Sequence, residues 1–388
     1  MKKAAIIFGL YFFVLSFLRC YGQQIASELP TDIRVAVVID ANQISVQVPS
    51  AYRLELPYTG ELLRSGPSLH KTMVYPETVG VRIGSFNPMV FGVKIIAPPE
   101  KGLYVNENKI RGTLNIIRNK NIKLTAINTL SLEDYIRSVV PSEIPKDWPA
   151  EAIKAQAIAS RTFAMYKMYV NRDKDFDVRS DIFSQVYKGK SVEYESTSVA
   201  IKETQGLVLV SESTIFPSFF HALCAGKTEN VMQIWGKKFI KTLEGTECAF
   251  CRQAPRFFWE ASFTPSQITS SLNKAGIRCS LINGIDISEH TPSGRVKELI
   301  LKSKGKEILV EATKFRIAVG PDVLRSTNFS VQKKDSRYIF KGQGWGHGVG
   351  LCQWGAYFMA KQGYNAKQIL QFYYPSSQVV HFSKAMLP

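Results

Sequence analysis

Hydrophobic and polar residues alternate over residues 31–48, a segment rich in Val and Ile. A period of two is typical of half-buried strands, and the Asp40–Asn42 segment inside the run predicts a turn between two of them. Short apolar runs separated by Gly, Pro and Asn continue over residues 52–126. We therefore predict a mostly β region over residues 25–127.

The pattern changes to helical spacing after this region. Residues 131–140 open on Ser131 and carry Asp134 three residues later, which is a signature of a helix N-terminus. A second, longer helix is predicted over residues 147–170, with Asp147 as its N-cap. Its many alanines make it thin, so that other elements can approach closely. We expect a buried helix of about 30 Å or slightly more.

The rest of the chain mixes both patterns. Residues 180–260 and 280–340 contain strand-like runs, whereas residues 264–275, 352–362 and 366–374 have helical spacing. Strands and helices do not alternate regularly, so a parallel βαβ sheet is not indicated. The predicted fold class is α+β, with β-rich N-terminal and C-terminal regions packed around the long Ala-rich helix and a substrate cleft between the lobes.

Residues 1–22 indicate a secretory signal. Two lysines precede an apolar run over residues 4–18, and the small residues Cys20 and Gly22 follow it, two positions apart. The alternative is a membrane anchor, but this run is short for a span of about 20 residues. Arg19 argues against a lipoprotein signal, because a small residue is needed before the cysteine. We expect export to the periplasm or cell envelope, with membrane attachment only through an uncleaved signal.

The chain is strongly basic. Its formal net charge is +17 over 388 residues, and removing the signal with its Lys2, Lys3 and Arg19 leaves +14. Such a charge attracts polyanions. After export the available polyanion is the cell envelope, so nucleic acid is not an expected partner. The alternative is that the charge serves solubility alone.

Glu143 is the first candidate for chemistry. It lies between Pro141 and Pro145, which restrict the backbone around it, and Ile144 and Trp148 are close in sequence. Burial against such apolar groups would raise the pKa of a carboxyl group toward neutrality, as a general acid requires. The alternative is a solvated surface glutamate.

The glycine-rich segment at residues 342–356 is the second candidate. Its glycines let the backbone approach a ligand closely, and it carries His347 together with Trp345 and Trp354, whose flat apolar rings suit sugar faces. A dinucleotide-binding loop is not indicated, because no βαβ unit surrounds the segment. The alternative is a tight turn with a core histidine.

A third pattern predicts a metal site. His221 and Cys224 form an HxxC motif, and Cys248 and Cys251 form a CxxC motif, which together supply the four ligands of a closed structural zinc site. The alternative is a disulfide between Cys248 and Cys251 in an oxidising compartment. The sequence contains neither HExxH nor GxSxG, so a zinc peptidase or serine hydrolase of those types is not predicted.

Several of these segments together resemble one known family. LEDYIRSVVPSEIPKDWPAEAIKAQAIASRTFA at 132–164, FHALCAGKTENVMQIWG at 220–236, SGRV at 293–296 and GWGHGVGLCQWGAYFMAKQG at 344–363 are similar to the stage II sporulation protein D (SpoIID/LytB) family. The resemblance covers roughly residues 100–380. It implies a catalytic region over residues 128–388.

The resemblance implies a lytic transglycosylase that cleaves the MurNAc–GlcNAc bond of peptidoglycan, preferably in strands stripped of peptides, and forms 1,6-anhydroMurNAc. It also implies that Glu143 is the acid/base and that some members carry zinc near the site. Cys352 stands where serine is common. We expect the substrate-binding residues to be His347, Gln353, Trp345, Trp354, Arg161 and Gln156.

Two other functions remain open at this point. The family contains members that modify a cell-wall amidase without cutting glycan, so a non-catalytic wall-binding protein is the main alternative, with an amidase as partner. A polyanion-binding protein that needs only the positive charge is the third hypothesis, and its binding would collapse with salt.

Overall fold

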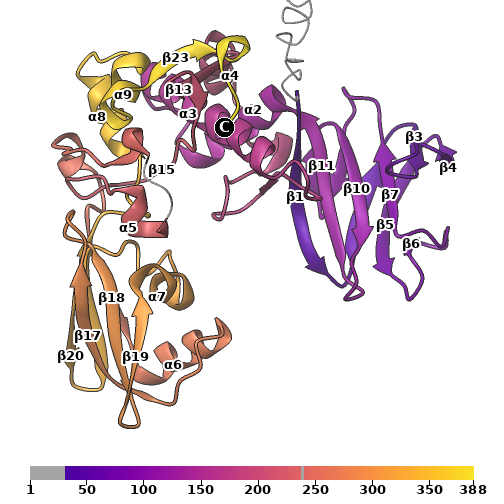
Figure 1. The fold of residues 1–388 in the computed structure, drawn as a ribbon. Helices are drawn as coiled ribbons and strands as arrows, with labels where there is room; N and C mark the ends of the chain where they lie inside the picture. The colour runs from indigo at the N-terminus through magenta and orange to yellow at the C-terminus, as the bar shows by residue number, and fades with distance from the viewer. Residues whose placement is uncertain (1–30, 237–239) are drawn as a thin grey trace, which may run out of the picture. The chain divides into compact units, whose positions relative to one another are not determined.

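The computed structural model describes residues 31–236 and 240–388 (Figure 1). The predicted signal at residues 1–22 lies outside the described residues. Within the described part of the chain, no helix has both the length and the hydrophobicity needed to cross a membrane.

The N-terminal region is built from two β-sheets. One has the strand order β12-β1-β11-β10-β7-β3-β4 and the other β6-β5-β2-β8-β9. The strands are β1 (Asp32–Ala41), β2 (Ile44–Val48), β3 (Tyr52–Glu55), β4 (Leu62–Gly66), β5 (Leu69–Pro76), β6 (Val81–Ile83), β7 (Gly92–Ile96), β8 (Leu103–Val105), β9 (Asn108–Ile110), β10 (Thr113–Arg118), β11 (Leu124–Ser131) and β12 (Val178–Arg179).

The alternating sequence pattern accounts for these strands. In β2, Ile44, Val46 and Val48 are buried and the residues between them are partly exposed, as a period of two requires. The turn between β1 and β2 falls at the expected place, and Asp40 has a left-handed φ of 53° there. The prediction of two strands over residues 31–48 is confirmed.

Helix α2 (Leu132–Glu143) begins as its sequence predicts. The Ser131 side chain is the N-cap and accepts a hydrogen bond from the Asp134 backbone N–H at 3.2 Å. The helix extends past the expected end at residue 140 and contains Pro141 in its last turn. Its final residue is Glu143, so the candidate acid lies at a helix end.

Helix α3 (Ala150–Val170) is the long Ala-rich helix. Its 21 residues span about 31 Å, and most of them are buried. Its N-cap is Pro149, so the prediction that Asp147 caps this helix is wrong: the helix begins two residues too late for that side chain. The small alanine side chains let α2, α4 (Glu195–Glu203), β13 (Leu207–Ser211), α8 (Gln353–Lys361) and α9 (Ala366–Tyr373) pack against α3.

A short parallel pairing joins two distant segments next to α3. β15 (Phe220–His221) pairs with β22 (Leu351–Cys352), which leads directly into α8. The remaining elements of this region are β14 (Thr214–Ile215) and β23 (Gln378–His381), which flank β13, the helix α5 (Val231–Trp235) and the 3₁₀ turns η1 (Gly189–Val192), η2 (Lys241–Leu243), η3 (Phe250–Gln253) and η4 (Phe382–Lys384).

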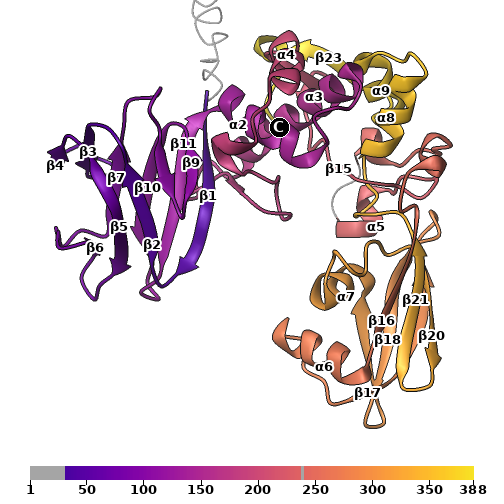
Figure 2. The same cartoon turned by 180° about the vertical axis from the view of Figure 1, so that it is seen from behind.

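Residues 258–343 form two three-stranded antiparallel sheets and two helices (Figure 2). Their side chains form a separate hydrophobic core, which includes Leu299, Phe315 and Phe340. The predicted helix at residues 264–275 is confirmed, with a Thr264–Gln267 capping box. The elements are β16 (Phe258–Phe263), α6 (Pro265–Lys274), β17 (Ile282–His290), β18 (Val296–Ser303), β19 (Lys306–Glu311), α7 (Ala312–Val319), β20 (Phe329–Lys334) and β21 (Arg337–Gln343). The fold is α+β, as predicted.

Candidate functional site

Glu143 lies at the C-terminal end of α2, and the residue is partly buried. The Val186 backbone N–H donates a hydrogen bond to its Oε1 at 2.8 Å. Burial raises the pKa of the carboxyl group from 4.5 to about 7, and it outweighs the hydrogen bonds from Val186 and the Gln353 side chain and the charge of Lys188, which lower the pKa. The carboxyl group can therefore be either protonated or ionised near neutral pH.

Tyr135 lies close to this carboxyl group, and Tyr187 stacks on Tyr135. Tyr135 and Tyr187 stack with their ring centroids 5.5 Å apart. Tyr135 donates to Gln185 Oε1 at 3.1 Å, and Tyr187 donates to an oxygen of Asn128 at 2.7 Å. Burial, followed by the charge of Glu143, raises the pKa of Tyr135 well above its ordinary value. Both hydroxyl groups are thus neutral and are held by other side chains.

The raised pKa of Glu143 predicts a pH-dependent stability. Below an ordinary carboxyl pKa of 4.5, the folded and unfolded chains both carry the proton, so burial has no electrostatic cost. As the pH rises toward about 7, only the unfolded chain releases its proton, and the free energy of unfolding falls. Glu143→Gln, which stays neutral, should therefore gain stability over wild type between about pH 4.5 and pH 8, by at most about 3 kcal/mol.

This prediction is checked by urea unfolding of both proteins at several pH values. Glu61→Gln is the matched control, because Glu61 is exposed in the loop before β4 and undergoes the same chemical change. A stability difference between Glu143→Gln and wild type that does not change with pH would contradict the burial of the Glu143 carboxyl group.

Of the predicted residues, the structure brings Gln353 to Glu143, and Gln156 contacts Gln353. Gln353 is the first residue of α8, and its side chain hydrogen-bonds Glu143. Its Nε2 also donates to Gln156 Oε1 at 3.4 Å, and Gln156 Nε2 donates to Ser160 Oγ at 3.0 Å. Both glutamines are at least 95% buried. They are suited to holding the carboxyl group in place.

Arg161 does not line a cleft, so its predicted role in substrate binding is wrong. Its side chain is fully buried, and its Nε and Nη2 donate to the two carboxylate oxygens of Glu133 at 2.7 and 2.9 Å. Its Nη1 donates to the Leu207 carbonyl at 3.0 Å. Arg161 therefore joins α2, α3 and β13.

Trp354 belongs to a group of three aromatic rings. Trp354 directly follows Gln353 in the sequence, and another member, Trp148, lies five residues after Glu143. Its ring lies 5.0 Å from that of Trp148 and 5.3 Å from that of Tyr357, and the Trp148 and Tyr357 rings are 5.1 Å apart. All three residues are partly exposed. Trp148 and Tyr357 were not predicted as binding residues. The sequence feature that could have identified them is an aromatic residue five positions after Glu143 and another four positions after Gln353.

Trp345 and His347 contact a different set of residues. Arg325 lies 4.7 Å from the Trp345 ring centroid, and the His347 ring is 5.1 Å from that of Trp235. The Val349 backbone N–H donates to His347 Nδ1 at 3.1 Å. Burial lowers the pKa of His347 to about 3, against a smaller opposing effect of a hydrogen bond to the Phe220 backbone. A neutral His347 held by backbone groups fits a structural role better than the predicted contact with a sugar.

Three of the four predicted metal ligands lie in one cluster of four cysteine thiols. The sulfur atoms of Cys224, Cys248, Cys251 and Cys352 all lie within 4.8 Å of one another. His221 is not among these mutually close ligand atoms; its Nδ1 lies 3.1 Å from the Val349 carbonyl oxygen. Cys352 joins the cluster because β22 pairs with β15. Cys248 and Cys251 are free thiols in this structure, without the alternative disulfide.

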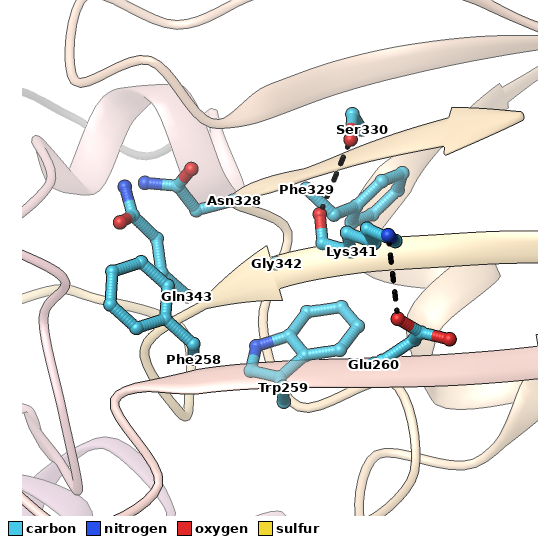
Figure 3. A pocket seen from close by; sticks show the side chains of 9 residues that line it. All are labelled: Phe258, Trp259, Glu260, Asn328, Phe329, Ser330, Lys341, Gly342 and Gln343. Atoms are coloured by element: carbon cyan, nitrogen blue, oxygen red, sulfur yellow. Dashed lines mark hydrogen bonds and ion pairs between the residues drawn. The ribbon is translucent and has the colours of Figure 1, made fainter.

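A separate cavity of about 550 Å³ lies on the sheet of β16, β21 and β20 (Figure 3). Trp259 and the Glu260–Lys341 ion pair, with an Nζ–Oε2 distance of 3.6 Å, are on its wall. Gly342 is needed beside them, since a Cβ there would lie 2.2 Å from the Trp259 ring. The cavity is lined by Phe258, Trp259, Glu260, Asn328, Phe329, Ser330, Lys341, Gly342 and Gln343.

Neither this cavity nor those found at the N-terminal sheets is lined by Glu143. The predicted substrate cleft therefore stays a prediction, although the fold class that it accompanied is observed. What the described residues show at Glu143 is a shielded carboxyl group with ordered hydrogen-bond partners.

Known families match two overlapping parts of the chain. Residues 120–210 match the model of the SpoIID family, described as Stage II sporulation protein, and these residues include Glu143 and all of α3. Residues 183–350 match a family described as Domain of unknown function (DUF8618).

Three relatives are similar over most of the chain. An uncharacterized protein of Brachyspira hyodysenteriae is 29% identical over 91% of this chain and 94% of its own length. Stage II sporulation protein D of Bacillus subtilis is 28% identical over 66% of this chain and 76% of its own length. The amidase enhancer of Bacillus subtilis is 27% identical over 64% of this chain but only 40% of its own length.

Proposed function

Because the chain belongs to the stage II sporulation protein D (SpoIID) family, we propose that it is an exported lytic transglycosylase of peptidoglycan with Glu143 as its acid/base. The observation that carries the proposal is the shielded carboxyl group of Glu143, whose pKa of about 7 lets one group first donate and then accept a proton at neutral pH. The basic charge of the chain suits attraction to the anionic cell envelope.

The reaction needs one carboxyl group because no water takes part. A hydrolase normally uses two carboxyl groups that flank the bond. Here protonated Glu143 donates its proton to the oxygen that bridges MurNAc C1 and GlcNAc C4, and the C1–oxygen bond breaks. The resulting carboxylate takes the proton of the MurNAc C6 hydroxyl group, and the C6 oxygen forms the new bond to C1. The products are a 1,6-anhydroMurNAc end and a free GlcNAc hydroxyl, and Glu143 is protonated again.

The neighbours of Glu143 have separate tasks in this proposal. Gln353, supported by Gln156, holds the carboxyl group in one orientation. Trp354, with Trp148 and Tyr357, offers partly exposed aromatic faces on which sugar rings can stack. The general acid–base contribution is about 10²–10⁴-fold, and oriented binding supplies much of the remaining acceleration.

The similarity to an amidase enhancer supports a second candidate function. In that case the chain binds the cell wall and increases the turnover of an amidase without cutting glycan. The aromatic faces would serve binding alike in both functions, whereas a raised carboxyl pKa is needed only for cleavage.

Product analysis separates the two. The purified chain is incubated with glycan strands that an amidase has stripped of peptides, and the products are identified by mass spectrometry. We expect fragments with 1,6-anhydroMurNAc ends. Fragments with reducing ends would show hydrolysis instead and contradict the one-carboxyl mechanism. Intact glycan, together with faster amidase turnover when the chain is added, would favour the second function and overturn the first.

A further inference from the structure

Four buried cysteines converge at one point in the described part of the chain. Cys224, Cys248, Cys251 and Cys352 are each at most 1% exposed, and their sulfur atoms all lie within 4.8 Å of one another. A buried free cysteine is often only a small hydrophobic residue. Convergence of four such thiols from separate segments is not required by packing and needs its own explanation.

The distances suit a metal better than a disulfide. A zinc ion binds thiolates at about 2.3 Å, and a tetrahedron of this size places its sulfur atoms about 3.8 Å apart. The Sγ atoms of Cys224 and Cys251 are 3.3 Å apart, well beyond the roughly 2.05 Å of a disulfide bond. Four soft thiolate ligands select zinc over magnesium or calcium.

The surroundings of the sulfur atoms suit thiolates. The backbone N–H groups of Cys224 and Gly355 donate to Cys352 Sγ at 3.3 and 3.4 Å. The Tyr373 hydroxyl lies 3.2 Å from Cys248 Sγ. Such outer contacts orient metal ligands and tune their charge.

A buried cation lies beside the cluster. Arg295 is 1% exposed, and its Nη2 donates to the Cys224 carbonyl oxygen. A zinc ion with four thiolates carries a net charge of −2, which the guanidinium partly offsets. The Glu229 carboxylate lies near the same guanidinium and is held by Thr291 and Ser293. The positive charge of Arg295 thus gives the proposed anionic centre a counterion inside the fold.

We infer that Cys224, Cys248, Cys251 and Cys352 form a closed, structural zinc site. Four protein ligands leave no position for water, so the metal takes no part in the glycan chemistry. Cys224 follows β15, Cys248 precedes η3, Cys251 lies within η3, and Cys352 ends β22. The metal therefore links chain segments that lie up to 128 residues apart.

The site has a consequence for the proposed function. Cys352 is the N-cap of α8 and directly precedes Gln353, which hydrogen-bonds Glu143. The metal would hold the start of α8, and with it Gln353, in position. This consequence rests on the proposed function, whereas the presence of the metal does not, so a metal measurement tests the site even if the chain cuts no glycan.

Elemental analysis of the full chain, purified without chelator, tests the inference. We expect about one zinc per chain, reduced at least about tenfold in Cys248→Ser and in Cys352→Ser, because each loses one of four ligands. Cys279→Ser is the matched control and should keep its zinc, since Cys279 contacts Asn273 outside the cluster. Zinc retained in both cluster variants, or iron in place of zinc, would overturn the inference.

A second measurement uses the unmutated chain, so that the zinc site can be tested even if the cysteine variants do not fold. The chain is treated with a thiol-alkylating reagent with and without a strong zinc chelator, and the modified cysteines are located by peptide mass spectrometry. The four cluster thiols should be protected until the chelator is added, whereas Cys279 should react in both cases. A Cys248–Cys251 disulfide, or protection that the chelator does not change, would contradict a zinc site.

Discussion

Glu143→Gln is expected to lower the rate of glycan cleavage by at least about 10²–10⁴-fold, because the amide can neither donate nor accept the proton that the reaction moves. The substitution disturbs the structure little. The amide oxygen can still accept the hydrogen bond from the Val186 backbone N–H, which reaches Glu143 Oε1 at 2.8 Å in the wild type. The rate is measured as the initial release of anhydro-ended fragments from peptide-stripped glycan.

The exposed Glu61→Gln variant is again the matched control and should keep the wild-type rate. Circular dichroism and thermal unfolding of each variant establish that a slow enzyme is still a folded one. If folded Glu143→Gln cuts as fast as the wild type, Glu143 is not the acid/base. Loss of cleavage in the control as well would point to an effect of charge on wall binding.

Arg161→Met is expected to destabilise the fold by about 3–5 kcal/mol without any direct effect on glycan binding. The guanidinium of Arg161 is fully buried and makes a bidentate contact with Glu133, whose side chain is 28% exposed. The variant leaves the Glu133 carboxylate and the Leu207 carbonyl oxygen without this donor. Urea unfolding at neutral pH measures the change.

Arg172→Met is the matched control, because Arg172 follows the same helix and is exposed, and its contacts are with the nearby residues Asp173 and Tyr169. Its stability should stay within about 0.5 kcal/mol of the wild type. The double variant Arg161→Met with Glu133→Gln should lose less free energy of unfolding than the sum of the two single variants. Each single change leaves the other side chain without its ion-pair partner. If Arg161→Met unfolds with the wild-type free energy but binds glycan poorly, Arg161 is a cleft residue after all.

The parts of the fold that depend on neighbours in sequence could be predicted. Ser131 caps α2 through the backbone N–H of Asp134, and the alternation in β2 buries every second residue, as the sequence pattern indicates. The segment around Glu143 made it a candidate, and the family resemblance pointed to it as the acid/base; its elevated pKa agrees with the shielding expected for it. The Asp147 cap failed because several nearby positions can begin a helix, and Pro149 took that place.

The parts of the site that depend on distant partners could not be predicted in this way. Arg161 was placed in the cleft because it follows Glu143 along the chain, but its charge is met by Glu133, 28 positions earlier. Likewise, no local motif links Cys352 to Cys224, which lies 128 positions before it.

The sequence by itself determined where most helices and strands of this protein lie, because periodicity, capping and proline constraints act over a few residues. Its resemblance to the SpoIID family made Glu143 the candidate for its chemistry. Only the tertiary structure decided which side chains meet: the β15–β22 pairing put Cys352 in place of His221 among the thiols and carried Gln353 to Glu143. These contacts form where charges and sulfur atoms are buried against segments that are distant in sequence, so the spacing of residues along the chain does not predict them.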